Sequence, residues 1–206
     1  MDDNSEHGGV HVDVDIEILD DPLRSEMVRG AITHFRKRDT DSLLERRVNP
    51  VQKKIPVLIH NGKSVCESLI IVEYIDEVWK DRCPLLLADP YQRAKAKFWA
   101  DFIDKMVYPP SDKVWAANGE EEEGGKKAFI DGIKLLEGEL KSNPYFGGET
   151  LGFLDIAFLP LYYWFHTFET FGKFSIEAEC PKLVAWGERS SCTPLYHTHI
   201  RSMTWR

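Results

Sequence analysis

Two short groups of residues in the first half of the chain have the chemistry needed to bind a peptide-like ligand. The first is Lys54-Ile55-Pro56, where a proline opens a β-rich run that ends at Ile59. Proline removes a backbone donor from a sheet, so it predicts either a cis peptide bond or an ordinary edge-strand proline. With a cis bond, the backbone N–H and C=O of Ile55 would face a ligand as a sheet edge does.

The second group is Glu67-Ser68, which follows a predicted hairpin and opens a predicted helix. A helix N-terminus has unpaired N–H groups and the positive end of the helix dipole, so it can hold a carboxylate. The neighbouring Glu67 side chain can hold an ammonium group. The pair therefore predicts a site for an amino-acid head group, and the alternative is that Ser68 only caps the helix.

The elements that must position these groups are most distinct after residue 49. Asn61-Gly62, between two β-rich runs, predicts a hairpin turn, and apolar residues at helical spacing predict a helix over 67–80. Before residue 49 the signals are weaker. They predict a disordered tail over 1–9, a strand over 10–18, a short strand at 30–35 and one or two helical turns near residue 42.

The second half of the chain is helical in pattern. Helices are predicted over 90–108 and 111–115, separated by a break at Pro109-Pro110, and over 126–140, 153–170 and 181–186. Residues 120–125 are predicted to form a solvated loop. The resulting fold class is α/β followed by all-α, with an α/β domain over 1–82, a linker over 83–89 and an all-helical domain over 90–206.

Composition limits the classes of function. The 206 residues carry a formal net charge of −8, which disfavours binding to nucleic acid or to an anionic membrane. The four cysteines form no CxxC pair, so we expect reduced thiols in the cytosol rather than zinc or a disulfide framework. His166, His197 and His199 raise the possibility of a metal site, but the sequence places no carboxylate beside His197-x-His199, so we expect no metal.

Over about residues 49–189 the chain resembles the plant tau-class glutathione S-transferases. The segments that carry the resemblance include Asn49-Pro50-Val51-Gln52-Lys53-Lys54-Ile55-Pro56-Val57-Leu58, Glu67-Ser68-Leu69-Ile70, Asp89-Pro90-Tyr91-Gln92-Arg93-Ala94, Gly152-Phe153-Leu154-Asp155-Ile156-Ala157 and Glu177-Ala178-Glu179-Cys180-Pro181-Lys182. The resemblance implies a thioredoxin-like N-terminal domain, an all-helical C-terminal domain and a homodimer. It also implies glutathione as co-substrate with no separate cofactor.

The resemblance also implies roles for individual residues. Lys54 would pair with the glycyl carboxylate of glutathione, Ile55 with its cysteinyl backbone, and Glu67 and Ser68 with its γ-glutamyl head. A pocket for a hydrophobic electrophile would be lined by Tyr108, Trp115 and Trp164, although aromatic residues on buried helices are more often core. Gly152 and Asp155 would cap the central helix and have no catalytic role.

The N-terminal segment departs from the family pattern. The family has a turn serine that stabilises the glutathione thiolate, whereas the nearest match here places Asp21 before Pro22, and Ser25 substitutes only if the turn is redrawn. Asp41 stands near the place of a family lysine, and residues 190–206 lose the resemblance to the family's terminal helix. The catalytic residue is therefore unknown. We expect a glutathione transferase with impaired catalysis, and the alternatives are a non-catalytic glutathione or apolar-ligand binder on the same fold, or an aberrant gene model or splice form.

Overall fold

A β-hairpin and the helix after it form the first described part of the chain. The computed structural model describes residues 49–52, 56–79 and 84–191. Strands β1 (Val57–His60) and β2 (Lys63–Cys66) pair antiparallel, with Val57 opposite Cys66 and His60 opposite Lys63. Asn61 and Gly62 have φ of 50° and 69°, the positive values that a two-residue hairpin turn requires. The predicted hairpin is confirmed.

Helix α3 (Ser68–Val78) packs one apolar face into the core through Ile71, Val72 and Ile75. The helix predicted over 67–80 is confirmed and ends at Val78. The strands predicted at 10–18 and 30–35, the helical turns near residue 42 and the tail over 1–9 lie outside the described residues.

A long helical rod follows, and here one prediction is wrong. Helix α4 (Pro90–Phe102) continues through a π-helical turn η1 (Ile103–Val107) directly into α5 (Tyr108–Ala116). Pro109-Pro110 therefore does not interrupt the rod. Proline has no N–H to donate to the carbonyl four residues back and its ring would collide with that carbonyl. The wider turn, in which the N–H of Tyr108 bonds to the carbonyl of Ile103, accommodates the two prolines within the first turn of α5.

Helix α6 (Glu120–Leu140) corrects a second prediction, because it includes the residues expected to form a loop. Its four leading glutamates lie at the positive end of the helix dipole, which favours helix over loop. Gly125 serves close packing: a Cβ atom there would lie 2.5 Å from the Cβ of Lys113 on α5. A Gly-Gly pair that suggests a loop in the sequence is thus a helix–helix contact in the structure.

The helix predicted over 153–170 is two helices, α7 (Phe153–Tyr162) and α8 (Phe165–Gly172). The continuous apolar pattern correctly predicted that these residues are buried, but a buried segment need not be one unbroken helix. A tight turn intervenes, in which the N–H of Trp164 bonds to the carbonyl of Leu161 at 3.0 Å. Helix α9 (Ile176–Glu179) was not predicted, and α10 (Pro181–Ser191) extends beyond the predicted 181–186.

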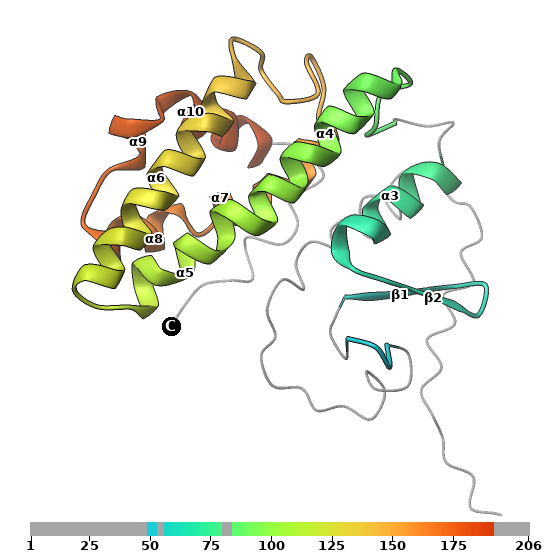
Figure 1. Ribbon diagram of the computed structural model, residues 1–206. Coiled ribbons are helices and arrows are strands. Elements are labelled where there is room, and N and C mark those ends of the chain that lie inside the picture. Colours follow the sequence, from blue (N-terminus) through green and yellow to red (C-terminus); the bar gives the residue numbers. More distant parts are fainter. Residues whose placement is uncertain (1–48, 53–55, 80–83, 192–206) are drawn as a thin grey trace, which may run out of the picture.

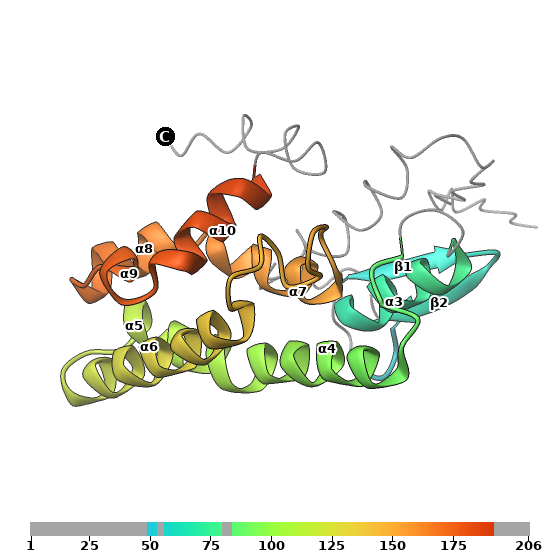
Figure 2. The ribbon, with the colours of Figure 1, turned by 90° about the horizontal axis from the view of Figure 1, so that it is seen from above.

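The rod of α4 and α5 connects the two parts of the molecule. Figures 1 and 2 show α4 running from beside α3 to the bundle formed by α5, α6, α8, α9 and α10. Helix α7 lies between these parts, and its side chains are almost all buried. The core combines aliphatic side chains with a cluster of aromatic rings, in which Trp186 stacks on Phe158 with ring centroids 5.0 Å apart. None of the described helices is long and apolar enough to cross a bilayer.

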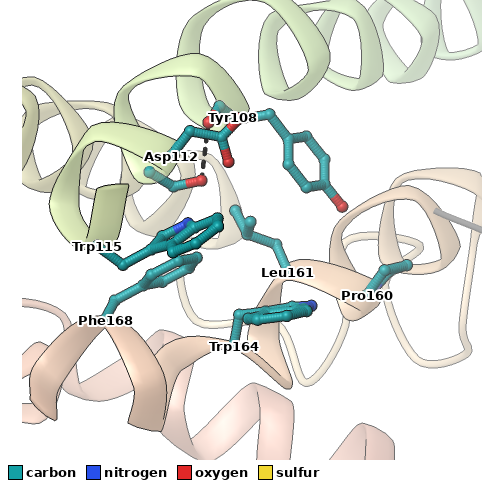
Figure 3. A pocket seen from close by; sticks show the side chains of 8 residues that line it. Tyr108, Asp112, Trp115, Pro160, Leu161, Trp164 and Phe168 are labelled. Atoms are coloured by element: carbon teal, nitrogen blue, oxygen red, sulfur yellow. Dashed lines mark hydrogen bonds between the residues drawn. The ribbon is translucent and has the colours of Figure 1, made fainter. Parts of the chain in front are cut away.

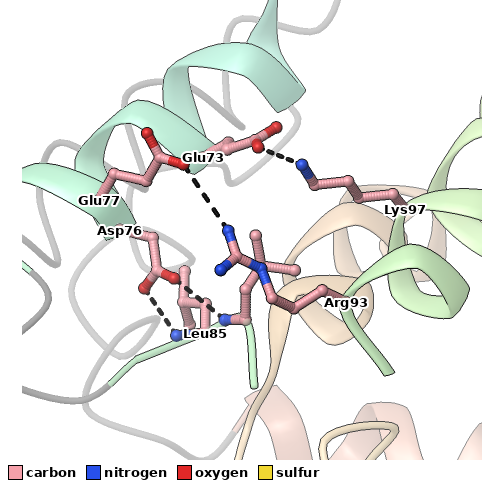
Figure 4. A network of polar contacts seen from close by, with 7 residues as sticks. Glu73, Asp76, Glu77, Leu85, Arg93 and Lys97 are labelled. Carbon is pink, nitrogen blue, oxygen red and sulfur yellow. Dashed lines mark hydrogen bonds and ion pairs between the residues drawn. The ribbon is translucent and has the colours of Figure 1, made fainter. Parts of the chain in front are cut away.

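Polar contacts tie α3 to the rod and to the segment between them (Figure 4). The buried carboxylate of Asp76 accepts hydrogen bonds from the backbone N–H groups of Leu85, at 2.6 Å, and Leu86, at 3.0 Å. On the outer side, Glu73 pairs with Lys97 and Glu77 approaches Arg93 at 3.7 Å. These contacts hold the N-terminal half of α4 against α3.

Candidate functional site

The junction between β2 and α3 has a strained backbone at a single residue. Glu67 has φ 73° and ψ 122°, a conformation that residues with a Cβ rarely adopt. Its carbonyl accepts the first helical hydrogen bond, from the N–H of Ile71 at 2.8 Å. Strain of this kind costs of order 1–3 kcal/mol and concentrates at ligand sites. The junction is therefore a candidate site on structural grounds.

Ser68 is the first residue of α3 and does not cap it. The cap position belongs to Glu67, and no side chain in the described part of the chain makes a capping hydrogen bond there. The alternative that Ser68 is only a helix cap is therefore wrong. The reason is the turn at Glu67. Because of this turn the helix starts at Ser68 itself, whereas a capping Ser68 would have to precede the first helical residue.

This arrangement suits an amino-acid head group. The first N–H groups of a helix have no partner within the helix, and with the Ser68 hydroxyl they provide donors for a carboxylate. The exposed carboxylate of Glu67, next in the chain, provides an acceptor for an ammonium group. Pro56 directly precedes β1, but Lys54 and Ile55 lie outside the described residues. The structure thus brings together Glu67 and Ser68 of the four predicted residues.

A shallow pocket opens between α5 and the α7–α8 turn (Figure 3), with an enclosed volume of about 30 Å³. The three residues predicted for an electrophile pocket all line it: Tyr108 and Trp115 from α5, and Trp164 from the turn. Trp115 and Trp164 are 37% and 40% exposed at its mouth, while Leu161 and Phe168 are buried. Their predicted role in binding an electrophile remains a prediction.

Helix α5 also contributes two polar pocket residues that the sequence reasoning missed, Ser111 and Asp112. The signal was present, because residues 108, 111, 112 and 115 follow the i, i+3, i+4, i+7 spacing of one helix face. The Ser111 hydroxyl donates to the carbonyl of Tyr108 at 2.8 Å, so it is occupied within the helix.

The start of α7 is a second polar centre, and it is structural. The buried carboxylate of Asp155 accepts four hydrogen bonds, from the N–H groups of Phe146, Gly147 and Gly152 at 2.8–2.9 Å and from the Trp186 indole at 2.7 Å. Burial raises the pKa of this carboxyl, and the N–H donors act against that rise. The predicted capping of the central helix by Gly152 and Asp155 is confirmed.

Neither Cys180 nor a metal-binding cluster forms a competing site in the part of the chain that the structure describes. Burial raises the pKa of the Cys180 thiol to about 12, so it is not a nucleophile near neutral pH. The described residues contain no group of three or more His, Cys, Asp or Glu side chains arranged to hold a metal ion. Asp21, Ser25, Asp41, His197 and His199 lie outside the described residues.

Comparison with known proteins identifies the family. Residues 26–77 match the family described as Glutathione S-transferase, N-terminal domain, and residues 92–189 match Glutathione S-transferase, C-terminal domain. Glutathione S-transferase U25 of Arabidopsis thaliana is 65% identical over 142 residues, which are 69% of this chain and 64% of that protein. The chain therefore spans just under two thirds of the length of this relative.

Solved structures agree. Rice GST1, crystallised in complex with glutathione, superposes with a TM-score of 0.75 at 34% identity, covering 83% of this chain and 82% of the rice chain. The tau-class glutathione S-transferase of mango gives a TM-score of 0.74 at 37% identity, covering 84% of each chain. The predicted fold class, a thioredoxin-like domain followed by an all-helical domain, is confirmed. The chain belongs to the glutathione S-transferase family, and within it to the plant tau class.

Proposed function

We propose that the protein binds glutathione at the start of α3 and conjugates its thiolate to hydrophobic electrophiles held in the pocket on α5. The observation that carries the proposal is the strained Glu67 junction, which leaves the start of α3 without a side-chain cap beside Ser68. Glu67 and Ser68 hold the γ-glutamyl head, and Lys54 and Ile55 hold the glycyl and cysteinyl units. The protein acts as a homodimer in the cytosol.

The pocket supports the second half of the proposal. Aromatic rings from α5 and the α7–α8 turn give an apolar surface with a few polar groups, which is typical of sites for small molecules. Tyr108, Trp115 and Trp164 then bind the electrophile. No separate cofactor is needed, because the nucleophile is the thiolate of glutathione itself.

We further propose that conjugation is slow. The thiolate needs a hydrogen-bond donor, and the sequence places Asp21, an acceptor, where the family has a serine. A carboxylate at that place raises the pKa of the thiol of glutathione. Loss of one such donor typically lowers the rate by a factor of about 10²–10³. We expect conjugation at least about a hundredfold slower than in an intact tau-class enzyme.

Binding is tested first, by calorimetric titration of glutathione. Ser68→Ala removes a donor to a charged group, which is worth roughly 1.5–3 kcal/mol, and should weaken binding about tenfold or more. Ser64→Ala on the exposed side of β2 is the matched control and should bind like the parent protein. No heat at millimolar glutathione, or an equal loss in both variants, would contradict the proposed site.

Catalysis is tested with 1-chloro-2,4-dinitrobenzene as a generic electrophile. The parent should conjugate slowly, and Asp21→Ser should recover part of the rate by restoring a hydroxyl donor. A parent rate equal to that of intact tau-class enzymes would show that another hydroxyl, Ser25 first, is the donor.

The alternative function is a non-catalytic binder of glutathione or of an apolar ligand. It is favoured by the same Asp21, which removes the activating group and leaves the Glu67-Ser68 junction intact. The two functions differ in one result. A binder gives glutathione-dependent heat in the titration and no conjugation even after Asp21→Ser.

A further inference from the structure

A single residue joins the β1–β2 hairpin to α3. Strand β2 ends at Cys66, α3 begins at Ser68, and Glu67 lies between them with φ 73° and ψ 122°. The hairpin is held together by the pairing of its strands and α3 by its helical hydrogen bonds. A change in the backbone angles of Glu67 therefore requires the hairpin to move relative to α3.

A hydrogen bond between the hairpin and α3 opposes that movement. The Nδ1 atom of His60, the last residue of β1, and the hydroxyl of Tyr74, in the second turn of α3, are hydrogen-bonded at 2.7 Å. Because a hydroxyl can donate or accept, the bond forms with either neutral tautomer of the imidazole. The His60 ring also packs against the rings of Tyr74 and Trp79, with centroid distances of 5.7 and 5.3 Å. All three side chains are half-buried.

The position of this hydrogen bond in the chain couples it to the strained residue. Glu67 lies midway between His60 and Tyr74 in the sequence, so the bond closes a loop that has Glu67 at its centre. The hairpin also packs on the core through Leu58 and Val65. Apolar packing of this kind has no preferred direction, whereas a hydrogen bond requires both a distance and an angle. The bond thus fixes the orientation of the hairpin on α3.

Loss of the bond should release the strain. A positive φ at a residue with a Cβ is unfavourable and persists only where the surrounding structure holds it. With the hairpin free to shift, Glu67 moves toward ordinary backbone angles, and its carboxylate changes position relative to the first N–H groups of α3. Affinity for a ligand that needs the strained arrangement then falls in proportion to the fraction of molecules that keep it.

We propose that His60 and Tyr74 are positioning residues whose hydrogen bond holds Glu67 in the conformation that binds glutathione. The inference rests on the proposed function, because glutathione is the ligand assigned to Glu67 and Ser68. His60 and Tyr74 act through the Glu67 backbone and not by touching the ligand.

The first measurement needs no ligand. The NMR coupling between the Cα and Hα atoms of Glu67 is smaller at positive φ than at ordinary negative φ. Tyr74→Phe keeps the ring and removes the hydroxyl, so this coupling should rise toward the ordinary value. A merely structural role would lower the free energy of unfolding but leave the coupling in the folded protein unchanged. An unchanged coupling in Tyr74→Phe would overturn the proposal.

The second measurement is calorimetric titration of glutathione. Tyr74→Phe and His60→Phe keep aromatic rings but lose the hydrogen bond, and each should weaken binding about threefold or more. His60→Asn retains a polar atom near the place of Nδ1 without the ring, and should bind within about twofold of the parent protein.

Tyr91→Phe is the matched control, because it removes the hydroxyl of an exposed tyrosine on α4, and it should bind like the parent protein. Equal affinities of Tyr74→Phe and Tyr91→Phe would contradict the role of the hydrogen bond. An equal loss in His60→Asn and His60→Phe would contradict it too, because the ring and not the polar atom would then be what matters.

The outcomes separate this inference from the proposed function. Absence of glutathione binding by the parent protein would contradict the proposed function, and the coupling at Glu67 in Tyr74→Phe would still test the control of its backbone. Glutathione binding that is equal in the parent protein and in Tyr74→Phe would contradict this inference and leave the proposed function in place.

Discussion

Two helix N-termini in this molecule are built in opposite ways. In the first turn of helix α7, the buried carboxylate of Asp155 accepts hydrogen bonds from three backbone N–H groups and from the Trp186 indole, and we call this start the sealed end. Helix α3 follows Glu67, whose backbone is strained and whose side chain is exposed. No side-chain cap is present there in the described structure, and we call this start the open end.

The contrast shows how one type of local structure can serve stability or binding. At the start of α7 the N–H of Gly152 donates to Asp155 and the N–H of Phe153 donates to the carbonyl of Leu85, and the residues around them are buried, so this end is closed to a ligand. At the start of α3 the protein accepts an unfavourable conformation and supplies no cap. A helix start without a side-chain cap leaves N–H groups that can donate to a carboxylate from solution.

The two ends are connected through one residue. The N–H of Leu85 donates to Asp76 on α3 at 2.6 Å, and the carbonyl of Leu85 accepts from the N–H of Phe153, the first residue of α7, at 3.0 Å. The sealed end of α7 is thus linked through Leu85 to α3, at the opposite end of α3 from Glu67. Substitutions at either end, or at the connection itself, therefore test whether the two ends are coupled.

The largest expected effect is at the sealed end. Asp155→Ala leaves four buried donors without their acceptor, and each such loss is worth about 1–3 kcal/mol, so even with incomplete additivity we expect a loss of about 4 kcal/mol in the free energy of unfolding. Urea denaturation followed by circular dichroism measures it. Asp131→Ala, at an exposed position on α6, should change stability by less than about 0.5 kcal/mol.

The same carboxylate gives a pH signature. Burial raises its pKa above the ordinary value of 3.8, so between about pH 4 and the raised pKa the folded protein binds more protons than the unfolded chain. The stability difference between the parent and Asp155→Asn should therefore fall as pH rises through that window and then level off. A difference that rises with pH would mean that the four N–H donors outweigh burial.

The second effect concerns the connection. Asp76→Ala removes the acceptor for the N–H groups of Leu85 and Leu86, and we expect a loss of about 2 kcal/mol in unfolding free energy. Because Asp76 lies in the third turn of α3, glutathione affinity should fall by less than in Ser68→Ala. Asp104→Ala, an exposed acid in η1, is the control for stability. A drop in affinity larger than that of Ser68→Ala would show that the open end depends on the connection.

The sequence predicted the elements whose signals are local. Asn61-Gly62 predicted the hairpin because few residues tolerate the two positive φ values, and Asp155 predicted the cap because it follows Gly152 at the capping distance. Both depend on residues within a few positions of one another. Of the candidate site, the sequence supplied Glu67, Ser68 and the three pocket aromatics.

The predictions from the sequence were wrong where contacts between residues far apart in the chain determine the local structure. Gly124-Gly125 indicated a loop, but Gly125 packs against Lys113 on another helix. Pro109-Pro110 indicated a break, but the π-helical turn that accommodates the prolines is not encoded by them alone. The strain at Glu67 was not foreseen, because a positive φ at glutamate has no signal in composition or spacing. That strain is what distinguishes the open helix end from a capped one.

Substitutions at Glu67 test this strain directly. At most positions glycine is less stable than alanine, but at φ 73° the order should reverse, because alanine keeps the steric conflict of its Cβ. Glu67→Gly should exceed Glu67→Ala by about 1 kcal/mol in unfolding free energy. Both variants should lose glutathione affinity by a similar factor, since both lack the carboxylate. If alanine is the more stable of the two, the Glu67 backbone does not have this conformation in solution.

The smallest expected effect comes from the surface ion pairs that join α3 to α4. The pairs Glu73–Lys97 and Glu77–Arg93 join α3 to α4 beside the buried Asp76, but their side chains are partly exposed (Figure 4). Exposed ion pairs are worth about 0–1 kcal/mol and are screened by salt, so we expect a coupling near 0.5 kcal/mol for each pair. Double-mutant cycles of Glu73→Ala with Lys97→Ala, and of Glu77→Ala with Arg93→Ala, measure it by urea denaturation. The coupling should shrink in 1 M sodium chloride, whereas the loss caused by Asp76→Ala should not. A coupling above about 2 kcal/mol that persists in salt would mean that surface charge, and not Asp76, is the main contact holding α3 in place.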